Sequence, residues 1–479
     1  MNRRRFLELI GSIALCTHGV RALANTERLT DDIVILIPGI MGSILKRGSD
    51  VVWGPNADAV WQVLKSGNLD LEFLRPSLSE TTTSSSVKAT GLFESTTLIP
   101  GFWKLDGYTE TRKVLIEQLG LTLGQNYFEF PYDWRLNNRI AAQNLIEMMS
   151  EKLSFWRDHI KRSDAKIVLI AHSMGGLIAR YACEVLGGWS TVREVFSLGT
   201  PYQGSVKALD RIANGMVSAG LTKTLSTFDS VYQLMPTYQC IDSGGGVLVS
   251  MDSMHSQLAD MIDMKRYIEV GKGFHDECDA AAKKNKTKGV NGLLHITQSS
   301  THKTLCSTRF DGHNLISSDR FGEKVGGGDG TVPGFQFARP KLTPASISYF
   351  HCDQLHGSIQ IDKSALINLA YTLRSEFPSG SRQNLESLSI RVTEFTRLGD
   401  PVRVELSLGF PQEGKIPLRI IDVVSGNIVL EKLVGQTEKW QTHTEEFSAT
   451  HVGIYRVVFG IENTNPYCRD ITCVAAPVS

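Results

Sequence analysis

The chain lacks an excess of charge of either sign, because its 50 Lys and Arg residues balance its 50 Asp and Glu residues. This balance gives no basic surface for nucleic acid, and no long run of like charge points to another polyanionic partner. The run Gly326-Gly-Gly-Asp-Gly330 is glycine-rich, but no strand and helix frame it as a phosphate-binding loop requires. The composition therefore argues against nucleic-acid binding and nucleotide chemistry.

Cysteine is also scarce, with eight residues in the whole chain at uneven spacing, so the fold cannot depend on a disulfide framework. Cys468 and Cys473 are close enough in sequence to be one candidate pair, and Cys306 with Cys352 is another. No Cys-x-x-Cys pair and no histidine cluster has the spacing of metal ligands. We therefore expect no metal site and no cofactor.

Long apolar runs are absent after the N-terminus, so we expect no transmembrane segment in the mature chain. The N-terminus itself resembles a twin-arginine export signal. Asn2-Arg-Arg-Arg-Phe-Leu7 precedes a modestly apolar stretch from Leu9 to Val20, and Ala22-Leu-Ala24 is a small-x-small cleavage site. The sequence thus predicts an export signal over residues 1–24 and a periplasmic or extracellular protein.

From Asp32 to Phe377, short β-branched runs alternate with helical patterns, which is typical of a mostly parallel sheet covered by helices. We predict an α/β domain over residues 32–377. Its strands are expected at Ile33–Ile37, Tyr127–Phe130, Lys166–Ala171, Glu194–Leu198, Leu293–Gln298 and Ser346–Phe350. Its helices are expected at Tyr108–Leu119, Ile140–Ile160, Gly175–Leu186 and Lys363–Arg374. Between residues 202 and 291 the strand pattern lapses, which predicts an inserted cap or lid.

Residues 378–384 have the composition of a linker, and they separate this domain from a C-terminal region of short alternating strands. Strands are expected at Ser387–Thr393, Val402–Leu408, Pro417–Ile421, Asn427–Leu433 and Gly453–Phe459. We predict a small all-β sandwich over residues 385–479. It holds no set of catalytic side chains, so we expect it to pack on the α/β domain or to bind a surface or a partner protein.

The most informative stretch is Lys166-Ile-Val-Leu-Ile-Ala-His-Ser-Met-Gly-Gly176, an apolar strand that runs directly into a helical pattern. This is the form of a nucleophile elbow, in which a sharp turn projects the hydroxyl of Ser173 above the sheet edge. Small residues must flank the serine two positions away on each side, and Ala171 and Gly175 meet that demand. His172 is adjacent to the serine, and we expect it to point away from the hydroxyl and to pack beneath the turn.

A serine hydroxyl needs a base, and the base needs an orienting acid. Gly328-Asp-Gly-Thr-Val-Pro333 supplies Asp329 at the expected end of a strand. Two histidines follow, and His356 is the better candidate base because Gly357 and a predicted helix come after it. His351 abuts the predicted strand Ser346–Phe350 and is the alternative base. Backbone N–H donors for the oxyanion are expected at Met174 and at Ile40, with Met41 as the alternative to Ile40.

Several motifs occur together in one order, and their combination resembles the lecithin:cholesterol acyltransferase family. They are Pro38-Gly-Ile-Met-Gly-Ser43, Ile99-Pro-Gly-Phe102, Phe130-Pro-Tyr-Asp-Trp-Arg135, Ala171-His-Ser-Met-Gly-Gly176, Ser197-Leu-Gly-Thr-Pro-Tyr-Gln-Gly-Ser205 and Gly328-Asp-Gly-Thr-Val-Pro333. The resemblance implies a lid-covered α/β-hydrolase fold that acts on lipid acyl esters through Ser173, Asp329 and His356. It also implies a mainly structural role for residues 132–135, with Trp134 lining the acyl site, and a membrane-binding role for the segment between Trp53 and Trp61. A core position for both tryptophans is the alternative.

These features predict a serine acyl hydrolase, similar to a lipase or phospholipase A, that acts on lipid esters at a membrane or lipoprotein surface. Transfer of the acyl chain to an alcohol acceptor uses the same motifs and stays open. A soluble carboxylesterase is a third possibility. A binding protein on a hydrolase scaffold is an alternative of another class, which the complete Ser–Asp–His set opposes.

Overall fold

The computed structural model describes the chain in segments. The described residues of the α/β part are 31–54, 74–76, 86–94, 97–99, 103–215, 219–244, 246–290, 292–321, 324–334 and 346–373. Those of the C-terminal part are 388–392, 395–397, 401–408, 415–422, 427–435, 441–448, 450, 453–459 and 467–474. The predicted export signal (1–24), the predicted linker (378–384) and Trp61 lie outside the described residues.

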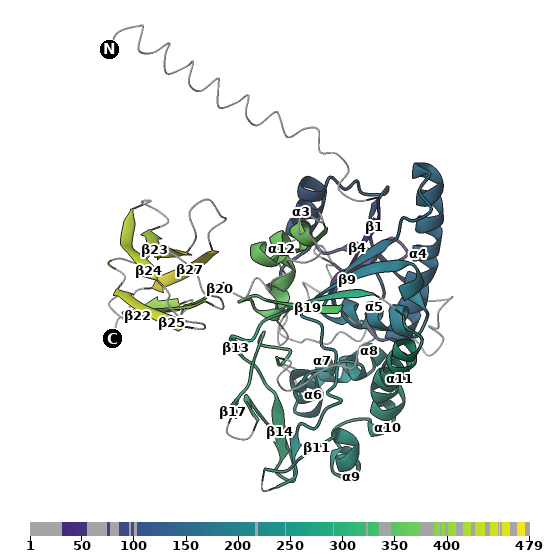
Figure 1. The fold of residues 1–479 in the computed structure, drawn as a ribbon. Helices are drawn as coiled ribbons and strands as arrows, with labels where there is room; N and C mark the ends of the chain where they lie inside the picture. Colours follow the sequence, from purple (N-terminus) through teal and green to yellow (C-terminus); the bar gives the residue numbers. More distant parts are fainter. Residues whose placement is uncertain are drawn as a thin grey trace, which may run out of the picture.

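A central sheet of six parallel strands organises the α/β part (Figure 1). Its strands are β1 (Ile33–Ile37), β7 (Tyr127–Glu129), β8 (Ile167–His172), β9 (Val192–Leu198), β12 (Leu293–Gln298) and β19 (Ser346–His351). They stand in the order β19-β12-β9-β8-β1-β7. All six agree with the predicted strands to within two residues at either end. The order and the parallel pairing make this an α/β-hydrolase-like fold.

Helices cover both faces of the sheet because the strands are apolar on both faces. Figure 1 shows α3 (Thr109–Leu119) and α12 (Lys363–Leu373) on one side, and α4 (Asn138–Ile160) and α5 (Met174–Glu184) on the other. The odd-numbered residues of β1 pack in the cluster with α4 and α5, whereas the even-numbered residues pack with α3 and α12. Because successive side chains of a strand point to opposite faces of the sheet, β1 contributes to both hydrophobic cores.

An antiparallel sheet at the start of the chain was not predicted. It consists of β2 (Ser43–Arg47), β3 (Asp50–Trp53) and β4 (Val87–Leu92), and a further pair is formed by β5 (Thr97–Ile99) and β6 (Trp103–Leu105). Trp53 at the end of β3 is only 3% exposed and packs edge-on against Phe93 and Trp134. Trp53 is therefore a core residue, and the membrane-binding interpretation is wrong for it.

Residues 202–291 form mostly short helices, as the loss of strand pattern predicted. They include α6 (Val206–Ala213), α7 (Ala219–Leu225), α8 (Asp229–Tyr232), η4 (Met251–Met254), α9 (His255–Leu258), α10 (Met264–Arg266), η5 (Tyr267–Lys272) and α11 (Gly273–Thr287), with β10 (Ile241–Asp242) and β11 (Leu248–Val249) between them. After β12 come β13 (His302–Lys303), β14 (Ser307–Phe310), β15 (Leu315–Ser318), β16 (Arg320–Phe321), β17 (Lys324–Val325), β18 (Gly327–Gly328) and η6 (His356–Ile361).

Within the described residues, no helix combines the length and apolar character needed to cross a bilayer.

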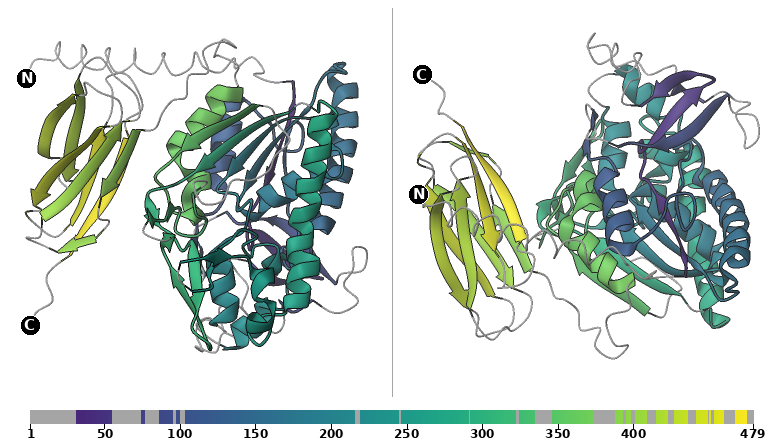
Figure 2. Two further views of the ribbon diagram at one scale, coloured as in Figure 1. Left: turned by 60° about the horizontal axis from the view of Figure 1, so that its bottom comes forward. Right: turned by 90° about the horizontal axis from the view of Figure 1, so that it is seen from above.

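The C-terminal strands form two antiparallel-rich sheets, and Figure 2 shows them gathered in a body of their own. One sheet has the order β20-β22-β25 and the other β21-β27-β26-β23-β24. The strands are β20 (Leu388–Val392), β21 (Phe395–Arg397), β22 (Pro401–Leu408), β23 (Lys415–Asp422), β24 (Ile428–Gly435), β25 (Gln441–Ser448), β26 (Gly453–Phe459) and β27 (Tyr467–Val474). The sequence analysis missed β21, β25 and β27.

Both candidate disulfides are wrong. Cys306 and Cys352 are buried free thiols. Cys468 and Cys473 lie on the same strand, β27, five positions apart. Because a strand rises roughly 3.3 Å per residue, their Cα atoms are about 16 Å apart, beyond the roughly 7 Å limit for a disulfide.

Candidate active site

Ser173 stands at the sharp turn between β8 and α5, as the elbow motif predicted. Its backbone has φ 52° and ψ −123°, in a region that residues with a side chain rarely adopt. The residues that flank the serine two positions away leave no spare space. Ala171 is fully buried in β8, and a Cβ on Gly175 would come within 2.5 Å of the Pro38 carbonyl oxygen. Close packing on both sides maintains the strained turn.

The three predicted side chains form one continuous chain of hydrogen bonds. Ser173 Oγ lies 2.7 Å from His356 Nε2, and His356 Nδ1 lies 2.7 Å from Asp329 Oδ2. All three residues are at most 4% exposed. The other carboxylate oxygen of Asp329 accepts the backbone N–H groups of Thr331 at 2.9 Å and Val332 at 2.6 Å. The backbone therefore fixes the carboxylate with one oxygen directed at the imidazole.

His351, the alternative base, is not part of this chain of hydrogen bonds. It is the last residue of β19 and pairs in register with Gln298 of β12. Burial lowers the pKa of its imidazole below the ordinary value. The structure thus brings His356, and not His351, to the serine.

Two glycines of the 197–205 motif make room for the site. A Cβ on Gly199 would lie 3.3 Å from Asp329 Oδ2 and 3.4 Å from His356 Nδ1, and its φ is +62°. A Cβ on Gly204 would lie 2.1 Å from the carbonyl oxygen of Met235. Ser205 then begins α6 and donates a hydrogen bond to the backbone carbonyl of Thr331, which joins α6 to the loop of the acid.

The predicted oxyanion donors lie on the two sides of Ser173. Met174 is the first residue of α5, so its N–H has no acceptor inside the helix. Ile40 follows β1 at the same sheet edge, and among the described residues no acceptor is found for its N–H. Met41, the alternative to Ile40, has φ 62°, and its carbonyl accepts a 2.9 Å hydrogen bond from the Trp53 indole.

Comparison of the sequence with family models gives one match. Residues 78–305 match the model of the lecithin:cholesterol acyltransferase family. This match covers a little less than half of the chain. The matched range contains Ser173 and ends before Asp329 and His356. No curated protein gives a match.

The similarity of the chain to solved structures is weak. Phospholipase PlaB from Legionella pneumophila is 10% identical, with 92% of each chain covered and a TM-score of 0.30. Lipase BlEst2 from Bacillus licheniformis, in its propeptide form, is 12% identical, with 93% of each chain covered and a TM-score of 0.29. The fold assignment rests on the strand order of the central sheet.

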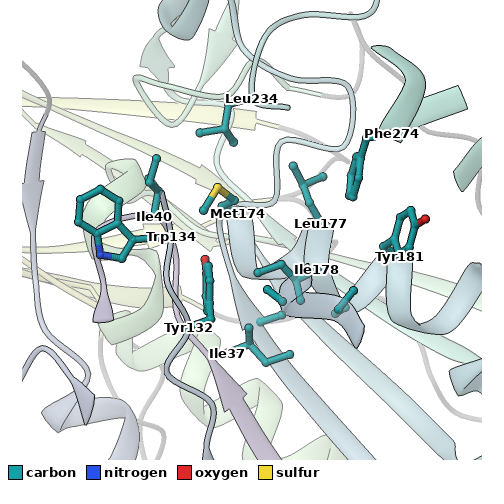
Figure 3. Close-up of a cluster of buried hydrophobic side chains, with 14 of the residues drawn as sticks. Ile37, Ile40, Tyr132, Trp134, Met174, Leu177, Ile178, Tyr181, Leu234 and Phe274 are labelled. Atoms are coloured by element: carbon teal, nitrogen blue, oxygen red, sulfur yellow. The ribbon is translucent and has the colours of Figure 1, made fainter. Parts of the chain in front are cut away.

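Ser173 and His356 line a largely apolar cavity that is partly open to solvent. Its apolar lining comes from Ile40, Ala208, Ile212, Val231, Leu234 and Val332. We call residues 38–42, which follow β1 and carry the predicted donor Ile40, the oxyanion loop. Figure 3 shows that this loop, the elbow and the inserted segment meet, since Ile40, Met174 and Leu234 lie in one cluster. The apolar side chains of this lining give the cavity a hydrophobic surface directly beside Ser173.

Two basic residues of α6 also line this cavity, and sequence reasoning missed both. Lys207 Nζ donates to the Gly330 carbonyl at 3.1 Å, and burial together with the charge of Arg211 lowers its pKa. The Arg211 Nε is buried without a hydrogen-bond partner in the described part of the chain. No helix was predicted over residues 206–213, so their spacing of four residues, which places them on one face of α6, was not a usable signal.

His172 is buried, as expected, but it is more than a packing residue. Its Nδ1 lies 2.9 Å from the Tyr108 hydroxyl and its Nε2 lies 3.0 Å from the backbone carbonyl of His356. Burial, followed by the nearby His356, lowers the pKa of His172 to about 3. The imidazole is therefore neutral at ordinary pH and connects the elbow to the loop of the predicted base.

The motif at residues 130–135 is structural in most of its contacts. Trp134 is fully buried, donates to the Ser43 carbonyl at 3.2 Å, and is not among the residues that line the cavity. Arg135 pairs with Asp133 at 2.5 Å and donates to the Leu74 carbonyl. The expectation that Trp134 lines the acyl site is thus wrong for this cavity. Among the described residues, no group of His, Cys, Asp and Glu is arranged to hold a metal.

Proposed function

We propose that the protein is a serine-dependent acyl hydrolase that acts on lipid esters through an acyl-enzyme intermediate. The observation that carries the proposal is the buried chain of hydrogen bonds from Ser173 through His356 to Asp329. Ser173 and His356 also line a largely apolar cavity, and residues 78–305 match the model of the lecithin:cholesterol acyltransferase family.

In the first step His356 Nε2 takes the proton from Ser173 Oγ while this oxygen attacks the ester carbonyl carbon. The carbonyl oxygen becomes an oxyanion, which the N–H groups of Ile40 and Met174 stabilise. Asp329 keeps His356 in the orientation with Nδ1 protonated and stabilises the imidazolium that forms. His356 then gives its proton to the leaving alcohol oxygen, and the acyl chain stays on Ser173.

In the second step a water molecule loses a proton to His356 and attacks the acyl carbon. Collapse of the second tetrahedral intermediate releases the fatty acid and returns the proton to Ser173. An alcohol in place of water gives acyl transfer. The family includes an acyltransferase by name, so transfer is the second candidate activity.

Residues 202–291 act as a cap in this proposal. Residues from α6 and α8 supply one wall of the cavity, and Ser205 ties the start of α6 to the loop of Asp329. A cap over the nucleophile excludes water and offers apolar surface to an acyl chain. The further proposals concern the termini: export through residues 1–24, and a surface- or partner-binding β sandwich over residues 385–479.

Mature protein incubated with vesicles of phospholipid and neutral lipid that contain an acceptor alcohol tests the activity, with mass spectrometry of the products. Ser173→Ala is the inactive variant, and Ser190→Ala, a change at an exposed serine, is the matched control. Serine-dependent free fatty acid supports hydrolysis, and a serine-dependent new ester supports transfer. Unchanged lipids with rapid cleavage of a short soluble ester indicate a carboxylesterase. No serine-dependent product from any ester contradicts an enzymatic role and favours a binding protein.

A further inference from the structure

The peptide unit between Pro38 and Gly39 is held at both of its polar ends by buried tyrosines. The Tyr132 hydroxyl donates a 3.0 Å hydrogen bond to the Pro38 carbonyl. The Gly39 N–H donates a 2.8 Å hydrogen bond to the Tyr108 hydroxyl oxygen. Tyr108 is fully buried and Tyr132 is 4% exposed. The next N–H along the chain is that of Ile40, the predicted oxyanion donor.

The hydrogen-bond directions around Tyr108 follow from the chemistry of its partners. A carbonyl oxygen only accepts, so the His172 Nε2 must carry the proton that it shares with the His356 carbonyl. The neutral His172 then offers a lone pair at Nδ1, and the Tyr108 hydroxyl donates to it. The hydroxyl oxygen stays available for the Gly39 N–H. Burial raises the pKa of Tyr108, which keeps it a phenol.

Close packing leaves this peptide little freedom to move. A Cβ on Gly39 would lie 2.9 Å from the Ser173 Cβ and 3.2 Å from His172 Nδ1, and one on Gly42 would lie 3.0 Å from the Tyr108 hydroxyl. Figure 3 shows the Tyr132 hydroxyl on the side of Ile40 and Met174. Tyr108 and His172 therefore join the oxyanion loop, the elbow and the loop of His356, and Tyr132 holds the same peptide unit at its other end.

We propose that Tyr108, Tyr132 and His172 are positioning residues that hold the Ile40 N–H where the oxyanion forms. The inference rests on the proposed function and deepens it. Tyr108 and Tyr132 fix the orientation of the peptide next to the donor. His172 links this peptide to the backbone of His356, so one network sets the distance between the donor and the base. None of the three side chains touches the reacting atoms.

The size of the effect follows from what an oxyanion donor contributes. Loss of one such donor lowers kcat by roughly 10²–10³-fold in serine hydrolases. A displaced donor retains part of its effect, so we expect Tyr108→Phe and Tyr132→Phe each to lower kcat about tenfold, with KM changed by less than about twofold. Tyr127→Phe is the matched control, because its buried hydroxyl bonds to Glu129 away from the oxyanion loop.

The experiment measures the rate at which a fluorophosphonate modifies Ser173, read by mass spectrometry of the full-length mature protein. In this reaction Ser173 Oγ forms a bond to phosphorus, fluoride leaves, and the serine proton passes to His356. The phosphoryl oxygen takes the position of the ester carbonyl oxygen, so the rate reports the oxyanion donors without knowledge of the natural substrate. The fraction of protein labelled at the end point gives the fraction of intact active sites. Division of the kcat for p-nitrophenyl butyrate by this fraction gives the activity per intact site.

The inference predicts an approximately tenfold lower labelling rate in Tyr108→Phe and Tyr132→Phe, and an unchanged rate in Tyr127→Phe. Because both tyrosines hold the same peptide, the double variant should lose less than the product of the two single losses. His172→Asn, whose amide oxygen replaces Nδ1 as an acceptor, should retain more activity than His172→Phe.

Three outcomes overturn the inference. If wild-type Ser173 is not labelled, the proposed function fails and the inference fails with it. If the wild type is labelled and Tyr108→Phe reacts at the same rate per intact site, the positioning role alone is wrong. If the variant only lowers the labelled fraction or the melting temperature, Tyr108 has a purely structural role.

Discussion

The Cα of Gly175 faces the carbonyl oxygen of Pro38 so closely that a Cβ would lie 2.5 Å from that oxygen. The Ile37 carbonyl oxygen would lie 2.8 Å from the same Cβ. The first turn of α5 and the end of β1 are therefore in direct backbone contact beside Ser173. This contact brings the two predicted oxyanion donors to the same place.

Gly175→Ala should thus damage the site as well as the fold. The added methyl group must push α5 away from the oxyanion loop, because backbone atoms surround it. We expect a loss of stability of about 1–3 kcal/mol and an esterase kcat at least tenfold lower. Chemical denaturation and active-site-normalised kinetics measure the two effects. Gly91→Ala is the control, since its nearest neighbour is the Ile44 Cδ1 at 4.0 Å. Equal activity in the two variants would contradict the close-contact explanation.

Substitution of each histidine separates the two candidate bases. His356→Ala should lower kcat by roughly 10³-fold or more, because Ser173 loses the base that accepts its proton. His351→Ala should keep most of the activity, because the hydroxyl of Ser173 hydrogen-bonds His356 and His351 stands at the end of β19. Steady-state kinetics on a soluble ester, with circular dichroism to check folding, decides between them. The reverse result would move the base to His351.

Two buried histidines should make the protein less stable in acid. Burial is the main cause that lowers the pKa of His172 to about 3 and that of His275 to about 4, against an ordinary value of 6.5. Below pH 6.5 both imidazoles become protonated in the unfolded chain but stay neutral in the folded protein. The stability that these residues contribute is therefore complete above pH 6.5 and is lost as the pH falls, down to about 4 for His275 and about 3 for His172. At pH 5 each histidine costs about 2 kcal/mol.

His275→Gln isolates one of these contributions. His275 lies on α11 and shares a 2.8 Å hydrogen bond with the Gln233 carbonyl, which a glutamine amide is able to replace. Urea unfolding at pH 8 and pH 5 gives the drop in stability for the wild type and for the variant. We expect the drop to be smaller by about 2 kcal/mol in the variant. An identical drop would mean that His275 titrates normally in the folded protein.

A partly buried ion pair joins the elbow helix to the inserted segment. Arg180 of α5 lies 2.7 Å from Asp279 of α11, with side-chain exposures of 3% and 30%. Asp279→Ala leaves the arginine charge buried and should cost about 2 kcal/mol, less than a fully buried pair because water reaches Asp279. Asp276→Ala on the same helix breaks the exposed pair with Lys272 and should cost under about 1 kcal/mol. Thermal unfolding compares the two, and similar melting temperatures would contradict the difference.

The sequence predicted the central sheet well because its strands carry strong signals. Ile33–Ile37 and Leu293–Gln298 were predicted with the observed bounds. The first is a continuous apolar run, as expected of a strand buried on both faces, whereas the second mixes apolar and polar residues. The strand β25 (Gln441–Ser448) was missed because Gln-Thr-His-Thr-Glu-Glu is polar on both faces. The period-two pattern gives no signal when neither face is apolar.

The candidate site was predictable where chemistry constrains neighbouring residues. Ser173 and Asp329 each stand in a recognisable local motif, whereas His356 was preferred to His351 only by its place before a predicted helix. The structure brings Ser173, Asp329 and His356 within hydrogen-bond distance. Tyr108 and the cavity-lining Lys207 were missed. Tyr108 meets Gly39 across 69 positions of the chain, and no local pattern encodes such a contact. Tertiary packing alone determines which buried hydroxyl accepts that N–H.

The strand order also determines when the Ser173–His356 contact forms during folding. The Ser173–His356 contact joins residues 183 positions apart, and the base follows β19 at the edge of the sheet. Contacts of such long sequence separation form late, because the chain must first close large loops. A chain with β1, β8 and α5 assembled but β19 undocked has a formed elbow without its base. During refolding, the reactivity of Ser173 towards a fluorophosphonate should therefore return after the helical signal.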